Sequence, residues 1–176
     1  MLILAVVVAF AYQYYVRDQQ DGVNDSLETT SGRTLDRSGS GMVTFPTAIL
    51  RQDNIAVLNL SNNELQTLPA EIGELTELEE LYLQDNQLDA IPAEIRKMPR
   101  LRILNVANNN LTGFPAEVGQ LYALRTLDLS GNKIDALPNE IRNLQDLETL
   151  DLTGNNFSQE YVEGLRSDLP QTTITF

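Results

Sequence analysis

Carboxylates, amides and hydroxyls carry the chemistry that this sequence offers, because it contains no histidine and no cysteine. The commonest general base, the commonest metal ligand and the thiolate nucleophile are therefore absent from the chain. Asp128 and Asp151 lie 23 residues apart on neighbouring repeat units, but two carboxylates without a ligand loop are too few to hold Ca²⁺. Carboxylate-only and Ser-Lys chemistry stay open, although no motif for either is present. We expect a chain that is not an enzyme and that holds no metal and no cofactor.

The acidic charge of the chain indicates which class of partner it can bind. The chain has 25 acidic and 12 basic residues, with a formal net charge of −13 and an isoelectric point of about 4.2. Phosphate backbones would repel such a surface, and without a basic patch there is no counterion release to drive binding. We expect no nucleic-acid partner.

Amides recur at a fixed spacing, and that spacing predicts the fold. The asparagines that share it are Asn63, Asn86, Asn109, Asn132 and Asn155, each 23 residues after the last. Apolar residues keep the same period: Leu78, Leu81, Leu83 and Leu88 return as Leu101, Leu104, Val106 and Leu111. Prolines do too, at Pro69, Pro92, Pro115 and Pro138. A period of this length predicts units that cannot bury their apolar side alone and therefore stack.

Each repeat contains the signals for one short strand and one helical turn. The Leu-x-Leu pair predicts a strand with both leucines on one side, and the asparagine after it can satisfy backbone groups where the chain turns. Proline suits the first position of the helical turn that follows. The carboxylate two residues later, such as Glu71 or Glu94, lies near the positive end of that turn.

The segment LEELYLQDNQLDAIPAEIRKMPR, residues 78–100, resembles the leucine-rich-repeat family in the form LxxLxLxxNxLxxLPxxIxxLxx. The likeness covers four full repeats and part of a fifth, and its register is similar to short bacterial membrane-anchored and plant-intracellular proteins of that family. It implies an α/β fold: a right-handed solenoid with a curved parallel sheet on the concave side and helical turns on the convex side. It also implies that the five asparagines form a ladder through the stack, and that partners bind the concave side.

Both ends of the repeat array depart from the pattern. Residues 33–54 read as a degenerate capping repeat, with Arg37 where leucine is expected and Ser40 where asparagine is expected. Residues 55–155 hold the clear repeats. Residues 156–176 lack the Leu-Pro step and predict a C-terminal cap, with a helix opened by Ser158 as N-cap and a last strand within Thr172–Phe176.

Residues 1–16, MLILAVVVAFAYQYYV, are almost wholly apolar. Read as a helix, they predict a membrane anchor with a tyrosine belt and Arg17 as its flank. A cleaved signal peptide is the rival interpretation, since Ala9-Phe10-Ala11 has the A-x-A form, although no basic segment precedes it. Residues 17–32 predict a flexible polar linker. We expect membrane attachment through the N-terminus and a repeat domain outside the cytoplasm, as in exported bacterial proteins.

The concave side supplies the candidate partner-binding residues, because the strand side chains before, between and after the two core leucines project there, with two arginines at one margin. These are Asn59, Glu80, Tyr82, Gln84, Arg102, Ile103, Asn105, Arg125, Asp128 and Asp151. We expect Tyr82 at the centre, since tyrosine is enriched at interface hot spots, and an acidic C-terminal half. The alternative is that none of these residues binds a partner: Asp128 and Asp151 only keep the surface soluble, and Tyr82 is an ordinary strand residue.

Two functions from different classes fit this pattern. The first is a membrane-tethered, monomeric protein-interaction module whose protein partner binds the concave side. The second is a cell-envelope or adhesion component that binds polysaccharide or a host surface. A row of aromatic side chains on the strands would favour the second, and only Tyr82 is present, so we favour the first.

Overall fold

A computed structural model describes residues 32–176 of the chain. The apolar helix predicted for residues 1–16, and the linker predicted for 17–32 apart from Gly32, lie outside these residues. Every helix in the described part falls short of the length and apolarity that a membrane span requires.

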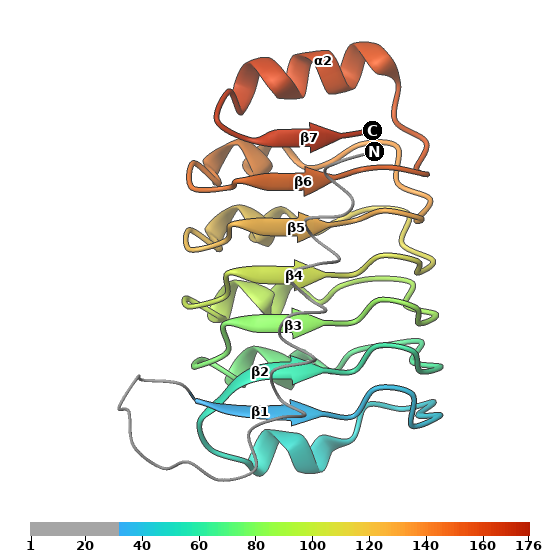
Figure 1. Ribbon diagram of the computed structural model, residues 1–176, viewed down its shortest axis with the longest axis vertical. Coiled ribbons are helices and arrows are strands. Elements are labelled where there is room, and N and C mark those ends of the chain that lie inside the picture. Colours follow the sequence, from blue (N-terminus) through green and yellow to red (C-terminus); the bar gives the residue numbers. More distant parts are fainter. Residues whose placement is uncertain (1–31) are drawn as a thin grey trace, which may run out of the picture. The chain divides into compact units, whose positions relative to one another are not determined.

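Seven parallel strands form one sheet whose spatial order follows the sequence, and the chain coils in a right-handed sense from each strand to the next (Figure 1). Neighbouring strands of the repeats are in register at 23 residues, as in Leu58 with Leu81 and Leu81 with Leu104, and the last strand pairs at 24. The predicted solenoid of the leucine-rich-repeat type is therefore confirmed. The strands are β1 (Arg33–Asp36), β2 (Ile55–Asn59), β3 (Glu80–Tyr82), β4 (Ile103–Asn105), β5 (Thr126–Asp128), β6 (Thr149–Asp151) and β7 (Thr173–Thr175).

Short 3-10 helices lie behind the sheet, one after each of the first five strands (Figure 1). The prediction that proline takes the first helical position was wrong by one residue: Pro92, for example, is the N-cap, with an extended ψ of 145°. Its carbonyl oxygen accepts the N–H of Ile95 at 3.2 Å, so the turn closes over three residues. These helices are η1 (Thr47–Arg51), η2 (Ala70–Glu74), η3 (Ala93–Lys97), η4 (Ala116–Gln120) and η5 (Asn139–Asn143).

The repeated leucines form one continuous core between the sheet and the turns. Leu58, Leu81, Leu104 and Leu127 are adjacent in register and fully buried. Burying a leucine side chain stabilises the fold by roughly 1.5–3 kcal/mol, and every repeat adds such a contribution. This core fixes which strand side chains remain outside.

Beside the core, the five periodic asparagines link successive repeats. The amide oxygen of Asn109 accepts the N–H of Leu88 at 2.9 Å, and its amide nitrogen donates to the carbonyl oxygens of Leu83 and Val106, both at 3.0 Å. Asn63, Asn86, Asn132 and Asn155 make the corresponding bonds. Each asparagine thus satisfies backbone groups of two adjacent repeats, which sets the rise between them.

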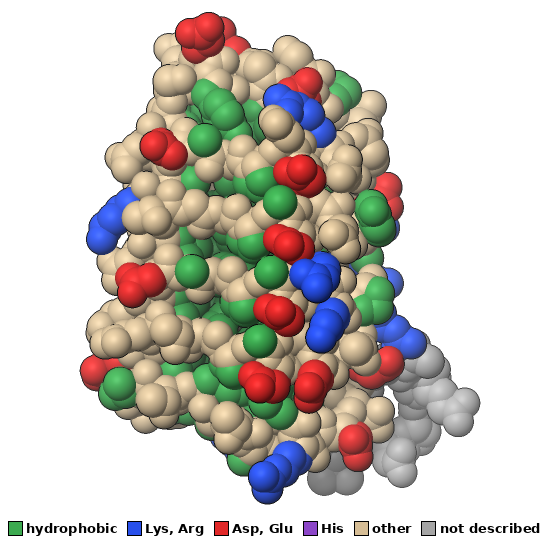
Figure 2. Space-filling view, turned by 180° about the vertical axis from the view of Figure 1, so that it is seen from behind, with side chains coloured by type: hydrophobic (Ala, Val, Ile, Leu, Met, Phe, Trp, Pro, Cys, Tyr) green, Lys and Arg blue, Asp and Glu red, His purple; other side chains and the backbone are tan. Residues whose placement is uncertain are grey.

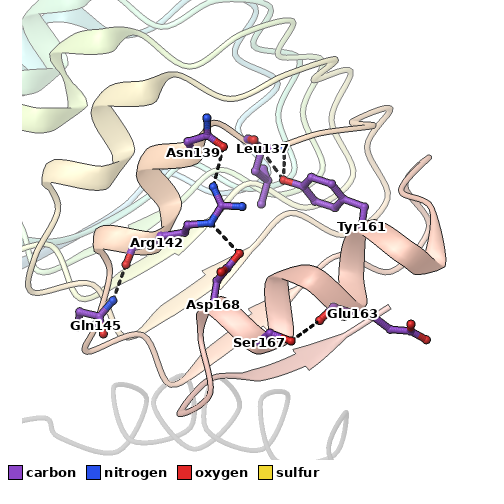
Figure 3. Close-up of polar contacts among 8 residues, drawn as sticks. All are labelled: Leu137, Asn139, Arg142, Gln145, Tyr161, Glu163, Ser167 and Asp168. Atoms are coloured by element: carbon purple, nitrogen blue, oxygen red, sulfur yellow. Dashed lines mark hydrogen bonds and ion pairs between the residues drawn. The ribbon is translucent and has the colours of Figure 1, made fainter.

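The C-terminal cap has the predicted helix and strand. Helix α2 (Gln159–Asp168) begins after Ser158, whose hydroxyl oxygen accepts the N–H of Tyr161 at 3.2 Å, so the predicted N-cap is confirmed. The Tyr161 hydroxyl bonds both backbone groups of Leu137, which fastens the helix to the last full repeat (Figure 3). Strand β7 then closes the sheet against β6.

Candidate binding surface

The side of the sheet away from the 3-10 helices is called here the sheet face. Its side chains come from alternate strand positions, because the intervening residues, such as Leu81 between Glu80 and Tyr82, point into the core. In the five central strands these positions are half-buried: Val57, Asn59, Glu80, Tyr82, Ile103, Asn105, Thr126, Asp128, Thr149 and Asp151. Seven of the ten predicted partner-binding residues belong to this set.

Four of those seven residues also have a local structural role. The Oδ1 atom of Asn59 accepts the N–H of Ser61 at 3.1 Å and its hydroxyl at 2.7 Å. Asp128 binds the N–H and hydroxyl of Ser130 in the same way, at 3.0 and 2.7 Å. Asn105 and Asp151 repeat the backbone bond with the second residue after them. These side chains therefore end each strand in a turn, and asparagine and aspartate serve equally.

Repeat 78–100 breaks this rule, because Tyr82 stands where its neighbours have asparagine. Tyr82 donates its hydroxyl hydrogen to Oε2 of Glu80, 2.8 Å away on the same strand. Gln84 replaces the serine that would pair with an Asx side chain, and its buried Oε1 has no hydrogen-bond partner among the described residues. A buried acceptor without a donor costs about 1–3 kcal/mol, so this local sequence is not the one that best stabilises the strand end.

Apolar side chains on the two neighbouring strands flank Glu80, two residues before the tyrosine. Val57 on β2 and Ile103 on β4 are the register partners of Glu80, and both are half-buried. Together with Tyr82 they form the apolar patch of the sheet face. The C-terminal strands have no apolar residue at the matching positions, where Thr126 and Thr149 stand instead.

Two carboxylates occupy that C-terminal half. Asp128 and Asp151 are register partners on β5 and β6. Burial raises the pKa of Asp128 above its ordinary value of 3.8, the two hydrogen bonds from Ser130 oppose the rise, and the charge of Asp151 adds to it. No Lys or Arg of the described chain forms an ion pair with either aspartate.

The two predicted arginines lie beside the sheet and are paired there. Arg102 lies 3.7 Å from Oε2 of Glu79, and Arg125 lies 2.5 Å from Oε1 of Glu148. Each pair joins consecutive repeats and is largely exposed, so it contributes little to stability. Both guanidinium groups therefore form ion pairs with acids beside the sheet and not with residues of the sheet face.

The opposite side of the molecule offers a weaker candidate surface. Figure 2, seen from behind the sheet, has acidic side chains following one another along the stack. Glu71, Glu94, Glu117 and Glu140 open successive 3-10 turns, and Glu117 lies 3.6 Å from Arg96. This row fits stabilisation of helical turns in a solvated surface.

A hollow of about 380 Å³ lies beside α2 in the C-terminal cap. Its cationic side chain, Arg142, bonds Asp168 at 2.6 Å and Asn139 at 2.6 Å (Figure 3). The guanidinium therefore ties α2 to η5, which accounts for its position without a ligand. Across the described residues, no group of three or more Asp and Glu side chains is placed to hold a metal ion.

The sequence predicted which residues lie on the sheet face, but not that its polar side chains also make the hydrogen bonds at the strand ends. Tyr82, Ile103 and Glu80 do come together, and Asn105 is the register partner of Tyr82. The strand-end bonds of Asn59 and Asp128 were missed, although the spacing Asn-Leu-Ser and Asp-Leu-Ser carries that signal. Val57 was not taken as a site residue; the structure puts it on the strand next to that of the tyrosine.

Comparison with known families agrees with this architecture. A family model described as "Leucine rich repeat" matches residues 99–157. A second, described as "Leucine Rich repeats (2 copies)", matches residues 53–97 and 76–116. The matches together run from residue 53 to residue 157. No curated protein sequence matches the chain.

Solved structures show the same fold. A leucine-rich-repeat protein of Leptospira interrogans is 36% identical over 77% of this chain, with a TM-score of 0.75. The ectodomain of the Arabidopsis thaliana membrane receptor kinase GASSHO1/SCHENGEN3, in complex with CASPARIAN STRIP INTEGRITY FACTOR 2, is 31% identical over 75%, with a TM-score of 0.62. The plant peptide hormone receptor RGFR1, in complex with RGF2, is 30% identical over 75%, with a TM-score of 0.64. This chain spans 34%, 16% and 22% of those three chains.

Proposed function

The chain belongs to the leucine-rich-repeat family, and from that membership we propose that it is a membrane-tethered protein-interaction module that binds its partner on the sheet face. Proteins of this family generally act by binding other proteins rather than by catalysis. The sheet face is the surface that the stack leaves open, since the apolar sides of the strands are used in the core.

Tyr82 is the observation that carries the proposal. It is the one aromatic side chain at the sheet-face positions of the described strands, and it stands where Asn59 and Asn105 make strand-end bonds. Tyrosine provides a large, rigid contact area at a small cost in side-chain entropy, which favours it in binding surfaces. Val57 and Ile103 flank Glu80, two residues earlier on the same strand, and add apolar surface that fits a partner with an apolar side chain.

The solved relatives support a peptide or protein as partner. GASSHO1/SCHENGEN3 and RGFR1 are each in complex with a partner, and RGFR1 is named a peptide hormone receptor. A short array such as this one would present a correspondingly short part of the same kind of surface.

The binding surface is tested by Tyr82→Ala. We expect this variant to keep its fold, because the side chain lies outside the core, and to lose partner binding by about tenfold or more, as hot-spot tyrosines do. Proteins captured by crosslinking from native cells would be quantified for the wild type and for the variant. Tyr122→Ala is the matched control, since Tyr122 is 66% exposed and lies outside the strands. Equal capture by the Tyr82 variant and the wild type would move the binding surface elsewhere.

The tether rests on the composition of residues 1–16, and we propose that it holds the repeat domain outside the cytoplasm. Deleting these residues should move the protein from the membrane fraction to the supernatant. Protease added to intact cells should degrade the repeats of the full chain. Unchanged sedimentation with the membranes after the deletion would refute the tether, and full protection from protease would refute the topology.

A further inference from the structure

The sheet face has two chemically different halves. The apolar patch of Val57, Tyr82 and Ile103 lies on β2 to β4, with Glu80 between Val57 and Ile103 and bonded to the Tyr82 hydroxyl. The two aspartates lie on β5 and β6. The charge of these aspartates is not required by the fold, because Asn59 and Asn105 make the same strand-end bonds without it. The fold therefore requires a side-chain oxygen that accepts hydrogen bonds at these positions, but it does not require the negative charge of an aspartate.

Each aspartate is held by one oxygen only. The bonds to Ser130 and Thr153 all end on Oδ1, and within the described part the Oδ2 atoms of Asp128 and Asp151 make no hydrogen bond and no ion pair. Other acids near the sheet have partners within the chain: Arg102 for Glu79, Arg125 for Glu148, and the Tyr82 hydroxyl for Glu80. The pair on β5 and β6 is thus fixed in orientation and lacks an internal cation.

Holding Asp128 ionised opposes stability. Burial raises the pKa of Asp128, and the neighbouring carboxylate raises it further, so the folded chain resists the charge that it carries at neutral pH. A cationic group between the two Oδ2 atoms would relieve both effects. An ammonium or guanidinium group donates the hydrogen bonds that these oxygens lack.

We propose that the sheet face binds an extended peptide segment that places an apolar side chain on Tyr82 and a lysine or arginine between Asp128 and Asp151. This inference rests on the proposed function and adds the chemistry of the partner. Adjacent strands are about 4.8 Å apart, so β5 and β6 lie roughly 10–14 Å from β3 along the stack. An extended chain advances about 3.3 Å per residue and points alternate side chains to one face, so the two side chains are four positions apart in the partner.

The test uses a library of random 12-residue peptides displayed on phage as the probe, selected in parallel on the full chain and on the double variant Asp128→Asn, Asp151→Asn. The variant keeps the strand-end bonds, as Asn59 and Asn105 show. Peptides enriched on the wild type alone should carry an apolar residue four positions from a lysine or arginine. Synthetic copies should bind the double variant about tenfold more weakly by fluorescence anisotropy, and their affinity should fall as salt is added.

Three variants separate the possible results. Glu140→Gln, on the opposite side of the molecule, should bind the selected peptides like the wild type. Loss of binding in Tyr82→Ala together with full binding in the double variant would overturn the cation contact and leave the sheet-face proposal standing. Full binding in both would overturn both. Selected peptides without a basic residue, or no enrichment beyond the double variant, would also overturn this inference.

Discussion

Asparagine and aspartate occupy two sets of periodic positions in this chain, and the two sets differ in what they contribute. The ladder set, such as Asn109, is buried and bonds backbone groups of adjacent repeats through both amide atoms. Aspartate could not replace it, because the carboxylate has no N–H to donate. The strand-end set uses only one oxygen, so Asn59 and Asp128 are both accepted there.

Asp128→Asn should stabilise the protein at neutral pH. The folded chain raises the pKa of Asp128 above 3.8, so it binds that proton more tightly than the unfolded chain does. The resulting stability is complete below about pH 3.8 and is lost as the pH rises through the folded value. The variant has no carboxyl group to ionise here and does not lose this stability. Its free energy of unfolding should therefore equal that of the wild type near pH 3 and exceed it at pH 7.

Urea unfolding measured from pH 3 to pH 7 would follow both proteins. Asp135→Asn is the control, since it removes the same charge from an exposed position. If the Asp128 variant were less stable than the wild type at pH 7, the carboxylate would have a stabilising contact that this account lacks.

At the level of single elements, the stacking of the 3-10 helices depends on two glycines. A Cβ on Gly119 would lie 2.3 Å from the carbonyl oxygen of Glu140, and one on Gly73 would lie 2.4 Å from that of Glu94. Since backbone atoms cannot move aside as a flexible side chain does, η4 and η5 must separate if Gly119 is replaced. The next repeats have Arg96 and Arg142 at the same positions, so the close approach occurs at every second interface.

Gly119→Ala should therefore lower the free energy of unfolding by about 1–3 kcal/mol, the usual range for overpacking. Gly113→Ala is the matched control, because its Cβ would meet nothing within 4 Å. Thermal unfolding followed by circular dichroism would compare the two variants. Equal melting temperatures would mean that the turns can shift apart without loss.

The elements were largely predictable from sequence, because one period governs them all. The strands, the C-terminal helix and its Ser158 cap follow from local pattern, and the repeated leucines identify the core. The place of proline was missed by one residue, since the turn closes by the shorter 3-10 bond. The pairing of Arg125 with Glu148 depends on rotamers across repeats, which spacing alone does not fix. The same limit applies to the site: spacing located Tyr82 on the sheet face, and only coordinates showed its bond to Glu80.

For the whole repeat domain, an open solenoid has two sheet ends that could pair with another chain. At the C-terminal end, α2 supplies an arginine that closes the exposed edge of β7. Thr173 and Thr175 bond β6 through their backbone, so the backbone of Ile174 points to the open edge. Its carbonyl oxygen accepts a hydrogen bond from Arg166 at 3.2 Å.

Arg166→Ala should leave the fold intact and increase self-association, because it frees the outward carbonyl of β7 and removes a charge from the edge. Sedimentation velocity over a hundredfold range of protein concentration would detect the change as a rise in weight-average mass. Arg100→Ala is the control, since it also removes an exposed arginine, one that pairs with Glu77 away from the sheet ends. An Arg166 variant that stays monomeric at all concentrations would show that α2 protects the edge by its bulk, and that the arginine bond serves only the cap.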